Sequence, residues 1–410
     1  MVANRMQAHL VIYSSLFPTS LEPDRSIFTA QLAEALSNNY RVSVVCPIPW
    51  CPNITGLRDF GPCRPYASLP RQESRGAVEV YYPRYPLVPN CPQIFQPWLQ
   101  RLAISRFLQK LHHQRRIDAV NAHWVYPDGV AAVWMAKNLG IPTLLTALGS
   151  DVNVSGEFLL RRRQLSRALT TVESASGVSR ALTERLIALG SPASRTHYIP
   201  NGINKKLFAP VSLGEKEILC RELGLNPSRK YLIFVGRLHP VKGLTHLVDA
   251  LSYLLNHDRL DFDTLLVGSG ELESILKASI RERGLERFVR LVGNVPHSNV
   301  RDWLRIGEAF CLPSLMEGMP NVVLEALACG LPVVASRVGA LPDMVNSESG
   351  ILVSAGTTLA LAQALSEVMT RRWDRTQIAC DAAGPDWSTV ADMYSVVIAS
   401  MIDEKACGSL

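Results

Sequence analysis

Long apolar runs and cysteine pairs are missing from this sequence, and each absence excludes a class of protein. No segment approaches the ~20 apolar residues that a membrane-spanning helix needs. The apolar stretch Leu10–Tyr13 is too short for the core of a secretion signal. The nine cysteines are odd in number and form no CxxC pair, which argues against a disulfide frame and against a zinc site. We therefore expect a cytoplasmic protein with reduced cysteines.

Charge is sparse as well, and it is unevenly shared. Charged residues make up 19% of the 410 residues and hydrophobic ones 47%, a balance typical of a packed globular chain. Residues 1–200 carry 21 Lys/Arg and 12 Asp/Glu, whereas the remainder carries 21 and 24. The basic first half favours anionic partners such as phospholipid head groups or phosphorylated carriers; a solvated basic surface would give the same pattern. Nucleic acid is not expected, because neither an RNA-binding motif nor a recognition-helix signature is present.

Short apolar runs alternate with helical patterns throughout the chain, which is typical of parallel sheets covered by helices on both faces. The length suits two domains, and the turn pair Asn201-Gly202 followed by Pro210 indicates a linker between them. We expect an α/β protein with one Rossmann-like domain over 1–205 and a second over 206–375. A C-terminal helical segment over 376–410 would pack back toward the first domain. The carboxyl ends of the two sheets would face each other across a cleft.

The apolar runs predict strands in both halves. Those of the first half are His9–Phe17, Tyr40–Pro47, Val78–Pro83, Asp118–His123, Pro142–Thr146 and Thr196–Pro200. Those of the second half are Tyr231–Val235, Phe262–Val267, Val289–Val292, Ala309–Pro313, Val333–Ala335 and Gly350–Val353. Ser26–Leu36 is the first predicted crossover helix. The helices predicted in the second half are Leu244–Leu255, Leu272–Gly284, Asn299–Ile306, Asn321–Cys329 and Thr358–Met369. The Pro-rich stretch from Pro47 to Pro97 is predicted to be mostly loop.

The strongest motif is Glu317-Gly-Met-Pro-Asn-Val-Val-Leu-Glu325, which follows a predicted strand and opens a helix. Pro320 suits a first helical turn because it lacks an N–H that would go unpaired there, and Gly318 lets a ligand approach the backbone. Such a helix N-terminus is a natural phosphate site. Glu325 lies one turn into the helix, where a carboxylate can accept paired hydrogen bonds from vicinal hydroxyls. A plain loop-to-helix junction is the alternative.

Two cations follow another predicted strand. The segment Gly236-Arg237-Leu-His-Pro-Val-Lys242-Gly243 leaves Tyr231–Val235 and leads into a helix. Arg237 can hold phosphate oxygens with its forked guanidinium, and Lys242 can add a point charge. Solvated loop cations are the alternative.

Together these segments resemble glycosyltransferase family 4, the retaining "glycosyl transferases group 1" enzymes of GT-B fold. The resemblance is dense from Ser176 to Val353. The segments that carry it are Glu317–Glu325, Gly236–Gly243, Leu265–Gly270, Tyr198–Gly202 and Gly330–Ala335. It implies GT-B architecture, in which two Rossmann-like domains with parallel sheets face each other across a cleft.

The resemblance also implies a role for each matching residue. Arg237 and Lys242 would hold the donor diphosphate. Glu317 would contact hydroxyls of the donor sugar, and Glu325 would bind the nucleotide ribose. Arg237, Lys242 and Glu317 are therefore the candidate catalytic residues. The whole candidate donor site comprises Gly236, Arg237, Lys242, Glu317, Gly318, Met319, Pro320, Asn321 and Glu325.

The first half resembles the same family less densely. The matching segments are Phe17-Pro18…Pro23…Phe28, Tyr126–Gly129 and Thr146–Asn153. Acceptor-side candidates are His123, which follows a strand, and Leu148 and Asp151 in the last segment. Leu148 stands where many members have a histidine near the transferred sugar, and Ser26 stands where many have a glycine. These departures indicate an active enzyme with an altered acceptor side.

Neither a metal nor a cofactor is expected. Asp261-Phe-Asp263 has the DxD form that binds metal in a different glycosyltransferase fold. Here it precedes a predicted strand, where a polar turn is usual. The nucleoside-diphosphate-sugar is the only small molecule that the motifs require, and it is a substrate.

The motifs and the resemblance thus predict a hexosyltransferase that moves a sugar from a nucleoside diphosphate onto a hydroxyl, and the resemblance implies retention at the anomeric carbon. A UDP-sugar is favoured as the donor. The expected acceptor is a glycan or lipid-linked glycan of the cell envelope, as in exopolysaccharide or lipopolysaccharide synthesis. Leu148 keeps open a non-catalytic sugar-nucleotide-binding subunit of a polysaccharide assembly complex. A nucleotide-sugar epimerase or a phosphorylase of the same architecture is the other alternative.

One segment predicts membrane contact. Ile94–Arg116 mixes aromatic and aliphatic residues with Arg101, Arg106, Lys110, Arg115 and Arg116, as an interfacial helix does. We expect peripheral attachment to the anionic inner face of the membrane. An ordinary helix packed on the first domain is the alternative.

Overall fold

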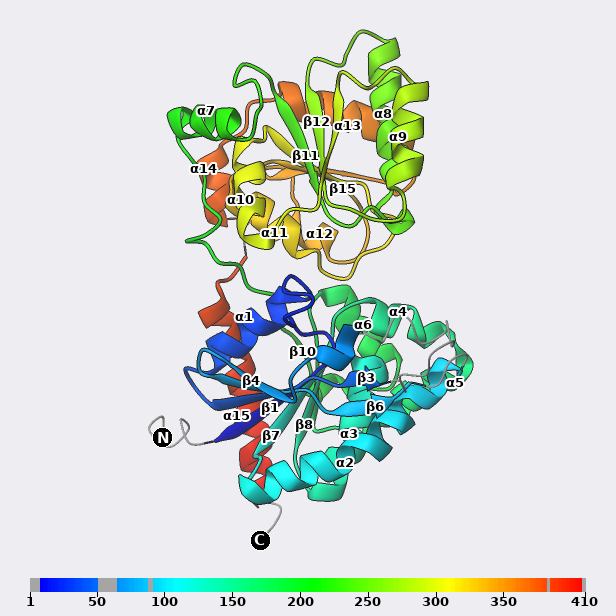
Figure 1. Ribbon diagram of the computed structural model, residues 1–410, viewed down its shortest axis with the longest axis vertical. Coiled ribbons are helices and arrows are strands. Elements are labelled where there is room, and N and C mark those ends of the chain that lie inside the picture. Colours follow the sequence, from blue (N-terminus) through cyan, green and yellow to red (C-terminus); the bar gives the residue numbers. More distant parts are fainter. Residues whose placement is uncertain (1–7, 51–64, 88–90, 382–383, 408–410) are drawn as a thin grey trace. The chain divides into compact units, whose positions relative to one another are not determined.

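The computed structural model describes residues 8–50, 65–87, 91–381 and 384–407. The chain divides into two compact units, each an α/β fold (Figure 1). Met1–Gly202 together with Trp387–Leu410 form the first unit, and Ile203–Asp386 form the second. The chain therefore leaves the first unit after Gly202 and returns to it at Trp387.

The first unit is built on an eight-stranded sheet. In sheet order its strands are β10 (Thr196–Tyr198), β9 (Ser174–Gly177), β8 (Thr143–Ala147), β7 (Ala119–His123), β1 (His9–Tyr13), β2 (Arg41–Val45), β5 (Val78–Tyr81) and β4 (Gln72–Arg75). The edge strand β4 pairs antiparallel with β5, and the other described pairings of this sheet are parallel. Every residue of β1, β7 and β8 is buried, as expected where both faces of a parallel sheet are covered.

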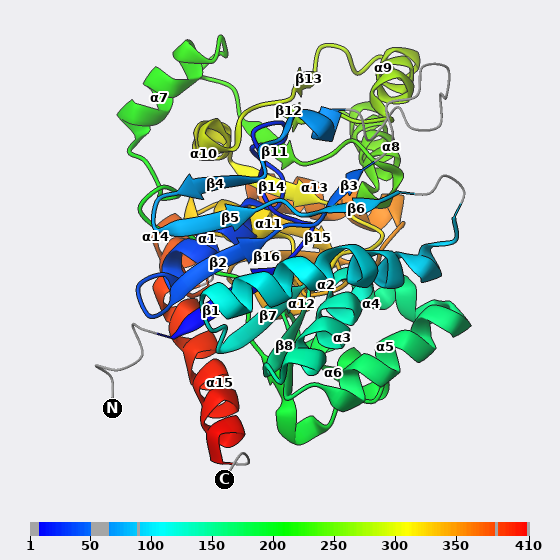
Figure 2. The same cartoon turned by 60° about the horizontal axis from the view of Figure 1, so that its bottom comes forward.

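Helices before and after the second unit cover this sheet. They are α1 (Ile27–Leu36), α2 (Gln96–Gln114), α3 (Val130–Leu139), α4 (Ser150–Asn153), α5 (Leu159–Thr171), α6 (Arg180–Ala188) and α15 (Trp387–Cys407). The last of these, α15, lies against α1 (Figure 2). Its residues Val390, Tyr394 and Ile398 recur at a spacing of four, so they share one face, and all three are buried in the core of the first unit.

The second unit contains a parallel six-stranded sheet. In sheet order its strands are β13 (Val289–Gly293), β12 (Asp263–Val267), β11 (Tyr231–Val235), β14 (Ala309–Leu312), β15 (Val333–Ser336) and β16 (Gly350–Val353). Its helices are α7 (Leu213–Glu222), α8 (Leu244–Asn256), α9 (Glu273–Glu282), α10 (His297–Ile306), α11 (Asn321–Ala328), α12 (Leu341–Met344), α13 (Thr358–Thr370) and α14 (Arg375–Asp381). The helix α8 buries Leu244, Leu247, Val248 and Leu251, the spacing of an amphipathic helix facing a core.

A strand is present at every predicted position, and β11 and β16 have the predicted bounds. The prediction of loop from Pro47 to Pro97 was wrong in part. It contains β4 and a small separate sheet of β3 (Ile48–Trp50) and β6 (Arg84–Pro86). Proline is tolerated in short edge strands, so proline content was a poor guide there. Residues 51–64 and 88–90 of this stretch lie outside the described residues. Within the described ranges no helix is both long and apolar enough to cross a membrane.

Candidate functional site

The loops that follow the strands of the second unit are joined by backbone hydrogen bonds. Leu238 N–H donates to Ser269 O at 2.9 Å, which joins the loops after β11 and β12. Leu315 N–H donates to Val241 O at 2.7 Å, which joins the loops after β14 and β11. Because parallel strands end at one edge of their sheet, these loops form a continuous rim. The candidate donor residues all belong to the loops after β11 and β14 or to the helix α11.

Lys242 and Glu317 meet at this rim. Lys242 Nζ lies 2.6 Å from Glu317 Oε1, and Ser314 Oγ donates to the same oxygen at 2.6 Å. The Lys242 side chain is 22% exposed and the Glu317 side chain 9%. Gly243 allows the approach: its φ is +65°, and a Cβ there would lie 2.0 Å from Pro313 O. A glycine is therefore needed to bring Lys242 against the loop that carries the carboxylate.

Arg237 lies on the same loop as Lys242, but its side chain is exposed and unpaired among the described residues. Its guanidinium makes no hydrogen bond or ion pair with any of them. A cation without a protein partner is available to an incoming anion, because no existing ion pair has to be broken. Lys242, by contrast, already forms an ion pair with Glu317.

Glu325 is bound by a histidine that the sequence did not identify. His297 Nε2 lies 2.7 Å from Glu325 Oε1, and the carboxylate side chain is 9% exposed. His297 is the first residue of α10, and its ring packs 5.8 Å from that of Phe208. The sequence predicted that this helix would begin at Asn299. Nothing in the local pattern relates His297 to a carboxylate 28 positions away, so only the fold reveals the pair.

The remaining donor-site candidates are Gly236, on the loop after β11, and the residues that lead into α11. Gly236 directly follows β11, and Gly318 and Met319 lead to Pro320, which precedes the first helical residue Asn321. Ala340 N–H donates to the carbonyl of Gly318 at 2.9 Å, which fixes this lead-in to the loop after β15. The positive end of the α11 dipole therefore lies at the rim, where it favours negative charge.

In the first unit, the Asp151 carboxylate forms hydrogen bonds with backbone N–H groups of two loops. Its carboxylate accepts hydrogen bonds from the N–H groups of Val125 at 2.8 Å and Gly149 at 2.7 Å, and from Leu148 at 3.2 Å. Burial raises the pKa of Asp151 to about 6, although these N–H groups favour the charged form. The acidic side chain thus ties the loop after β8 to the turn after β7.

His123 ends β7 and is only 2% exposed. Its ring lies 6.2 Å from that of Tyr394 on α15, and neither ring nitrogen has a hydrogen-bond partner among the described residues. Burial lowers the pKa of His123 to about 3, so the imidazole is neutral near pH 7. The structure therefore places it against the α15 helix, inside the first unit.

Leu148 and Ser26, the two departures from the family pattern, lie in different structural environments. Leu148 is half-buried, in the loop that Asp151 holds. Ser26 precedes α1 with φ +48° and ψ +46°, in the left-handed region that costs a non-glycine residue about 1 kcal/mol or more. A serine thus occupies a backbone conformation that suits the glycine found there in many members.

The DxD-like segment is engaged by basic side chains. Arg229 donates to both carboxylate oxygens of Asp263, at 2.5 and 3.1 Å, and Lys230 lies 3.3 Å from Asp261. Over the described part of the chain, no group of three or more His, Cys, Asp or Glu side chains is arranged to hold a metal ion.

Comparison with known proteins agrees with this architecture. Residues 229–371 match the family Glycosyl transferases group 1, and residues 26–202 match the Glycosyl transferase 4-like domain. A Bacillus subtilis protein named for teichuronic acid biosynthesis, the glycosyltransferase TuaC, is 30% identical over 375 residues that cover 89% of each chain. The lipopolysaccharide core biosynthesis mannosyltransferase LpsB of Rhizobium meliloti is 32% identical, over 63% of this chain and 75% of the relative.

Solved structures with the same fold include a sucrose-phosphate synthase from Thermosynechococcus elongatus, with 19% identity and a TM-score of 0.76. It covers 97% of this chain and 100% of that chain. Another is Anabaena HepE in complex with UDP-glucose, with 20% identity, a TM-score of 0.67 and coverage of 96% and 99%. The two Rossmann-like units thus have the GT-B fold. Since the sequence matches extend over both units, the chain is a glycosyltransferase and belongs to glycosyltransferase family 4, the glycosyl transferases group 1.

Proposed function

We propose that the chain transfers a hexose, with retention of anomeric configuration, from a nucleoside diphosphate to a hydroxyl of a cell-envelope glycan. The observation that carries this proposal is the Lys242–Glu317 pair beside the N-terminus of α11. A cation, a carboxylate and a positive helix end meet there. These are the groups needed to hold a diphosphate together with the hydroxyls of the attached sugar.

In the proposed reaction, the bond between the anomeric carbon and the diphosphate oxygen breaks, and its electron pair leaves with the diphosphate. The acceptor hydroxyl oxygen forms the new bond from the same face, and its proton passes to the departing phosphate oxygen. Arg237, Lys242 and the α11 terminus would stabilise the charge that develops on the diphosphate. Glu317 would hold the sugar and Glu325 the ribose.

The choice of donor and acceptor rests on the relatives. HepE has been solved in complex with UDP-glucose, which supports a UDP-sugar as the donor here. TuaC and LpsB are named for teichuronic acid and lipopolysaccharide core biosynthesis, which supports a glycan or lipid-linked glycan of the cell envelope as the acceptor.

A screen of UDP-, GDP- and ADP-sugars tests the donor proposal. Purified protein is incubated with each donor, and release of the free nucleoside diphosphate is measured with and without candidate acceptor glycans. We expect turnover with one nucleotide class, including slow hydrolysis without acceptor. Donor binding without any turnover across acceptors would favour the non-catalytic sugar-nucleotide-binding subunit instead.

We propose further that turnover needs neither a metal nor a cofactor, since the cations at the rim already face the diphosphate. Protein treated with EDTA should keep most of its turnover. If chelation abolishes activity and manganese restores it, Asp261 and Asp263 become the first residues to examine.

Membrane attachment is the other part of the proposal. In α2 and the turn before it, Phe95, Trp98 and Leu102 are 50–64% exposed, and Leu159 and Leu160 at the start of α5 are 65% and 55% exposed. The side-chain amide of Gln164 in α5 donates to Ile94 O at 3.2 Å, so the two apolar stretches adjoin.

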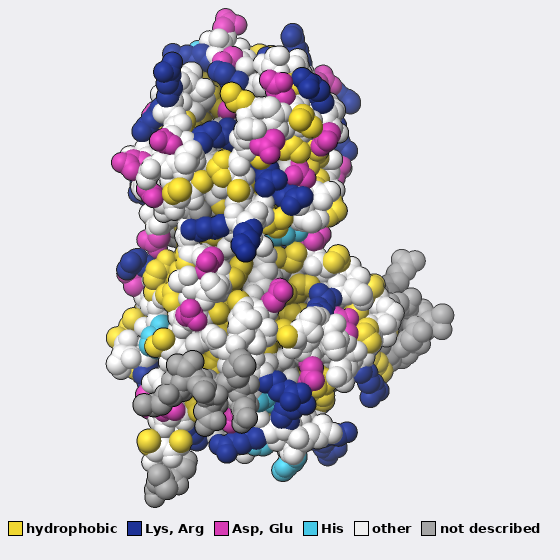
Figure 3. Space-filling model, turned by 90° about the vertical axis from the view of Figure 1, so that its left-hand side faces the viewer, with side chains coloured by type: hydrophobic (Ala, Val, Ile, Leu, Met, Phe, Trp, Pro, Cys, Tyr) yellow, Lys and Arg dark blue, Asp and Glu magenta, His cyan; other side chains and the backbone are white. Residues whose placement is uncertain are grey.

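Within the two segments that carry these apolar residues the charges are of one sign; Glu157, directly before the second segment, pairs with Arg185 at 2.5 Å. Neither Ile94–Arg116 nor Phe158–Val172 contains Asp or Glu, and Arg161–Arg163 directly follow the exposed leucines. On the face shown in Figure 3, by contrast, cationic and anionic side chains are interspersed. Exposed apolar residues flanked by arginines are typical of a surface that binds an anionic bilayer.

Flotation with phosphatidylglycerol-containing vesicles tests this attachment. We expect binding that weakens at high salt and falls at least tenfold in the Trp98→Ser/Leu159→Ser variant. The matched control is Leu213→Ser/Ile275→Ser, which removes two exposed apolar residues of the second unit and should bind as wild type does. Equal binding to phosphatidylcholine vesicles would contradict an anionic surface.

A further inference from the structure

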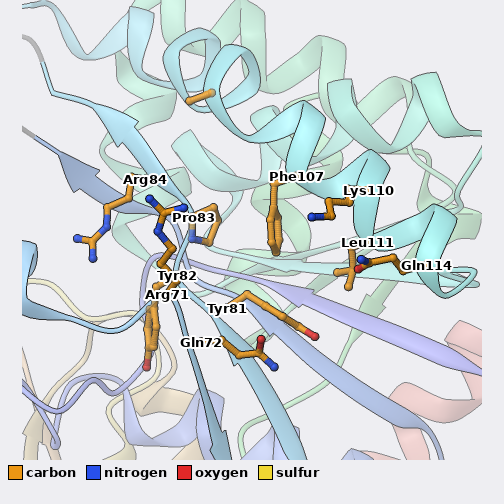
Figure 4. A pocket seen from close by; sticks show the side chains of 11 residues that line it. Arg71, Gln72, Tyr81, Tyr82, Pro83, Arg84, Phe107, Lys110, Leu111 and Gln114 are labelled. Carbon is orange, nitrogen blue, oxygen red and sulfur yellow. The ribbon is translucent and has the colours of Figure 1, made fainter.

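A cavity of about 560 Å³ lies in the first unit, away from every residue assigned above to the sugar donor. Its walls come from the start of β4, the end of β5, the start of β6 and one face of α2 (Figure 4). The residues of α2 that line it include Ala103, Phe107 and Lys110. They recur at spacings of four and three, so they share one face of the helix.

Among the described residues that line this cavity are three cations, Arg71, Arg84 and Lys110, and no carboxylate. The Arg84 guanidinium donates to Tyr66 O at 2.5 Å and Leu69 O at 2.6 Å. Burial, together with the nearby charge of Arg71, lowers the pKa of Arg84. The side chains of Arg71 and Lys110 are exposed and make no hydrogen bond or ion pair with the described residues. Figure 4 shows them on opposite sides of the cavity.

Acidic residues near these walls are already paired. Glu79, which accepts from the Tyr81 hydroxyl at 3.0 Å, lies within 3.2 Å of Arg115. Glu73, which accepts from the Tyr82 hydroxyl at 2.7 Å, lies 2.6 Å from Arg75. The positive charge of the cavity is therefore not neutralised by these carboxylates, and an anionic ligand would relieve the repulsion between its cations.

Part of the wall is apolar. The rings of Tyr81 and Phe107 pack 5.5 Å apart, and the buried Leu111 completes this side. The exposed apolar residues Trp98 and Leu102 lie on the preceding turns of the same helix, on an adjoining face. The cavity thus combines cations with an apolar surface, next to the segment that we propose to contact the bilayer.

We infer that this cavity binds a phosphate ester that carries an apolar chain. The phosphate lies between Arg71 and Lys110, and the chain lies on Phe107 and Leu111. This site is separate from the donor site, and its occupation does not depend on the proposed sugar transfer. A membrane lipid and a water-soluble phosphate share the anionic group, but only the lipid uses the apolar wall.

Calorimetric titration of the full chain tests this inference with monomeric ligands, so that no bilayer is present. Three probes are compared: dihexanoyl phosphatidic acid below its micelle concentration, glycerol 3-phosphate, and dihexanoyl phosphatidylcholine. We expect phosphatidic acid to bind at least tenfold more tightly than either of the others. Equal affinity for glycerol 3-phosphate would overturn the role of the apolar wall, and equal affinity for phosphatidylcholine would overturn that of the cations.

Two charge-matched double variants localise the binding. Arg71→Gln/Lys110→Gln should raise the Kd for phosphatidic acid at least tenfold. Arg287→Gln/Arg290→Gln removes the same charge from a cavity of the second unit and should leave the Kd unchanged. A wild-type Kd in the first variant, or equal weakening in both, would overturn the inference. Since the substituted side chains are exposed, thermal unfolding should show both variants folded.

Discussion

The two units use carboxylates at the ends of their strands in opposite ways. In the second unit, Glu317 and Glu325 are bound by side chains from other elements, Lys242 and His297. In the first unit, Asp151 is bound by backbone N–H groups. A ligand can replace a lysine or an imidazole as the partner of a carboxylate, whereas replacing backbone donors would undo a loop. We therefore expect the same chemical group to serve a ligand in the second unit, whereas it stabilises a loop in the first.

The largest expected effect is a loss of kcat/KM when the cations at the rim of the second unit are removed. Lys242→Ala leaves the nearly buried Glu317 without its cation, and Arg237→Ala removes the unpaired charge beside it. Loss of a charge-assisted contact costs about 1.5–3 kcal/mol, so each variant should lower kcat/KM at least about tenfold. The measurement is the rate of nucleoside diphosphate release with the preferred donor.

Lys230→Ala is the matched control for these variants, since Lys230 pairs with the exposed Asp261 in the same unit. It should retain wild-type kcat/KM. Wild-type turnover in an Arg237→Ala/Lys242→Ala double variant would show that the rim is not the donor site.

The next effect concerns buried ionisable groups of the first unit. The pKa of His123 is about 3 in the folded chain and about 6.5 when unfolded, so only the unfolded state gains a proton between these values. Stability is therefore intact above pH 6.5 and falls as the pH drops. At pH 5 the loss from His123 is about 2 kcal/mol. His123→Leu should remove that part of the pH dependence in urea unfolding at pH 7.5 and pH 5.

His113→Leu is the comparison for this measurement, because His113 is exposed on α2. Its unfolding free energy should change with pH as in wild type. If His123→Leu also keeps the wild-type pH dependence, the imidazole is not held neutral in the folded chain.

A smaller effect tests whether His297 acts through Glu325. His297→Leu removes a hydrogen bond worth about 1 kcal/mol and frees the carboxylate to rotate. The donor KM should rise about fivefold, while kcat changes less. His297→Gln keeps an N–H donor and should recover part of the affinity. A kcat that falls at unchanged KM would remove Glu325 from donor binding.

The smallest effect concerns the loop before α1. Ser26→Gly relieves the left-handed strain at φ +48° but adds backbone entropy to the unfolded chain, so a net gain of about 0.5 kcal/mol in unfolding free energy is expected. Ser37→Gly, at the other end of α1, has φ −66° and should lower stability. Denaturant midpoints of the two variants should therefore move in opposite directions.

The sequence predicted the second unit more fully than the first for physical reasons. Strands such as Tyr231–Val235 are apolar throughout, and the rim residues lie in loops that directly follow such strands. By contrast, β9 has the sequence Ser-Ala-Ser-Gly and went unpredicted. A Cβ at Gly177 would lie 2.6 Å from Thr183 N, so small residues are required where α6 packs against this strand. Close packing by a later helix leaves no apolar pattern to detect.

Contacts between residues distant in the sequence were the other feature that the sequence pattern could not predict. A local pattern locates Glu325 one turn into a helix, but the partner His297 depends on how α10 lies against α11. Likewise, His123 is the last residue of a strand, as the predicted bounds gave it, yet its burial against Tyr394 depends on a helix more than 250 residues later in the chain. Contacts of this kind follow from the fold and not from spacing.

The return of the chain to the first unit at Trp387 has a consequence for the order of folding during synthesis. The second unit, Ile203–Asp386, is complete before α15 leaves the ribosome. The core of the first unit contains Val390, Tyr394 and Ile398, so this unit has an uncovered apolar face until those residues emerge. The unit whose synthesis begins first is therefore the last to complete its core, and its apolar surface stays exposed for longer during synthesis.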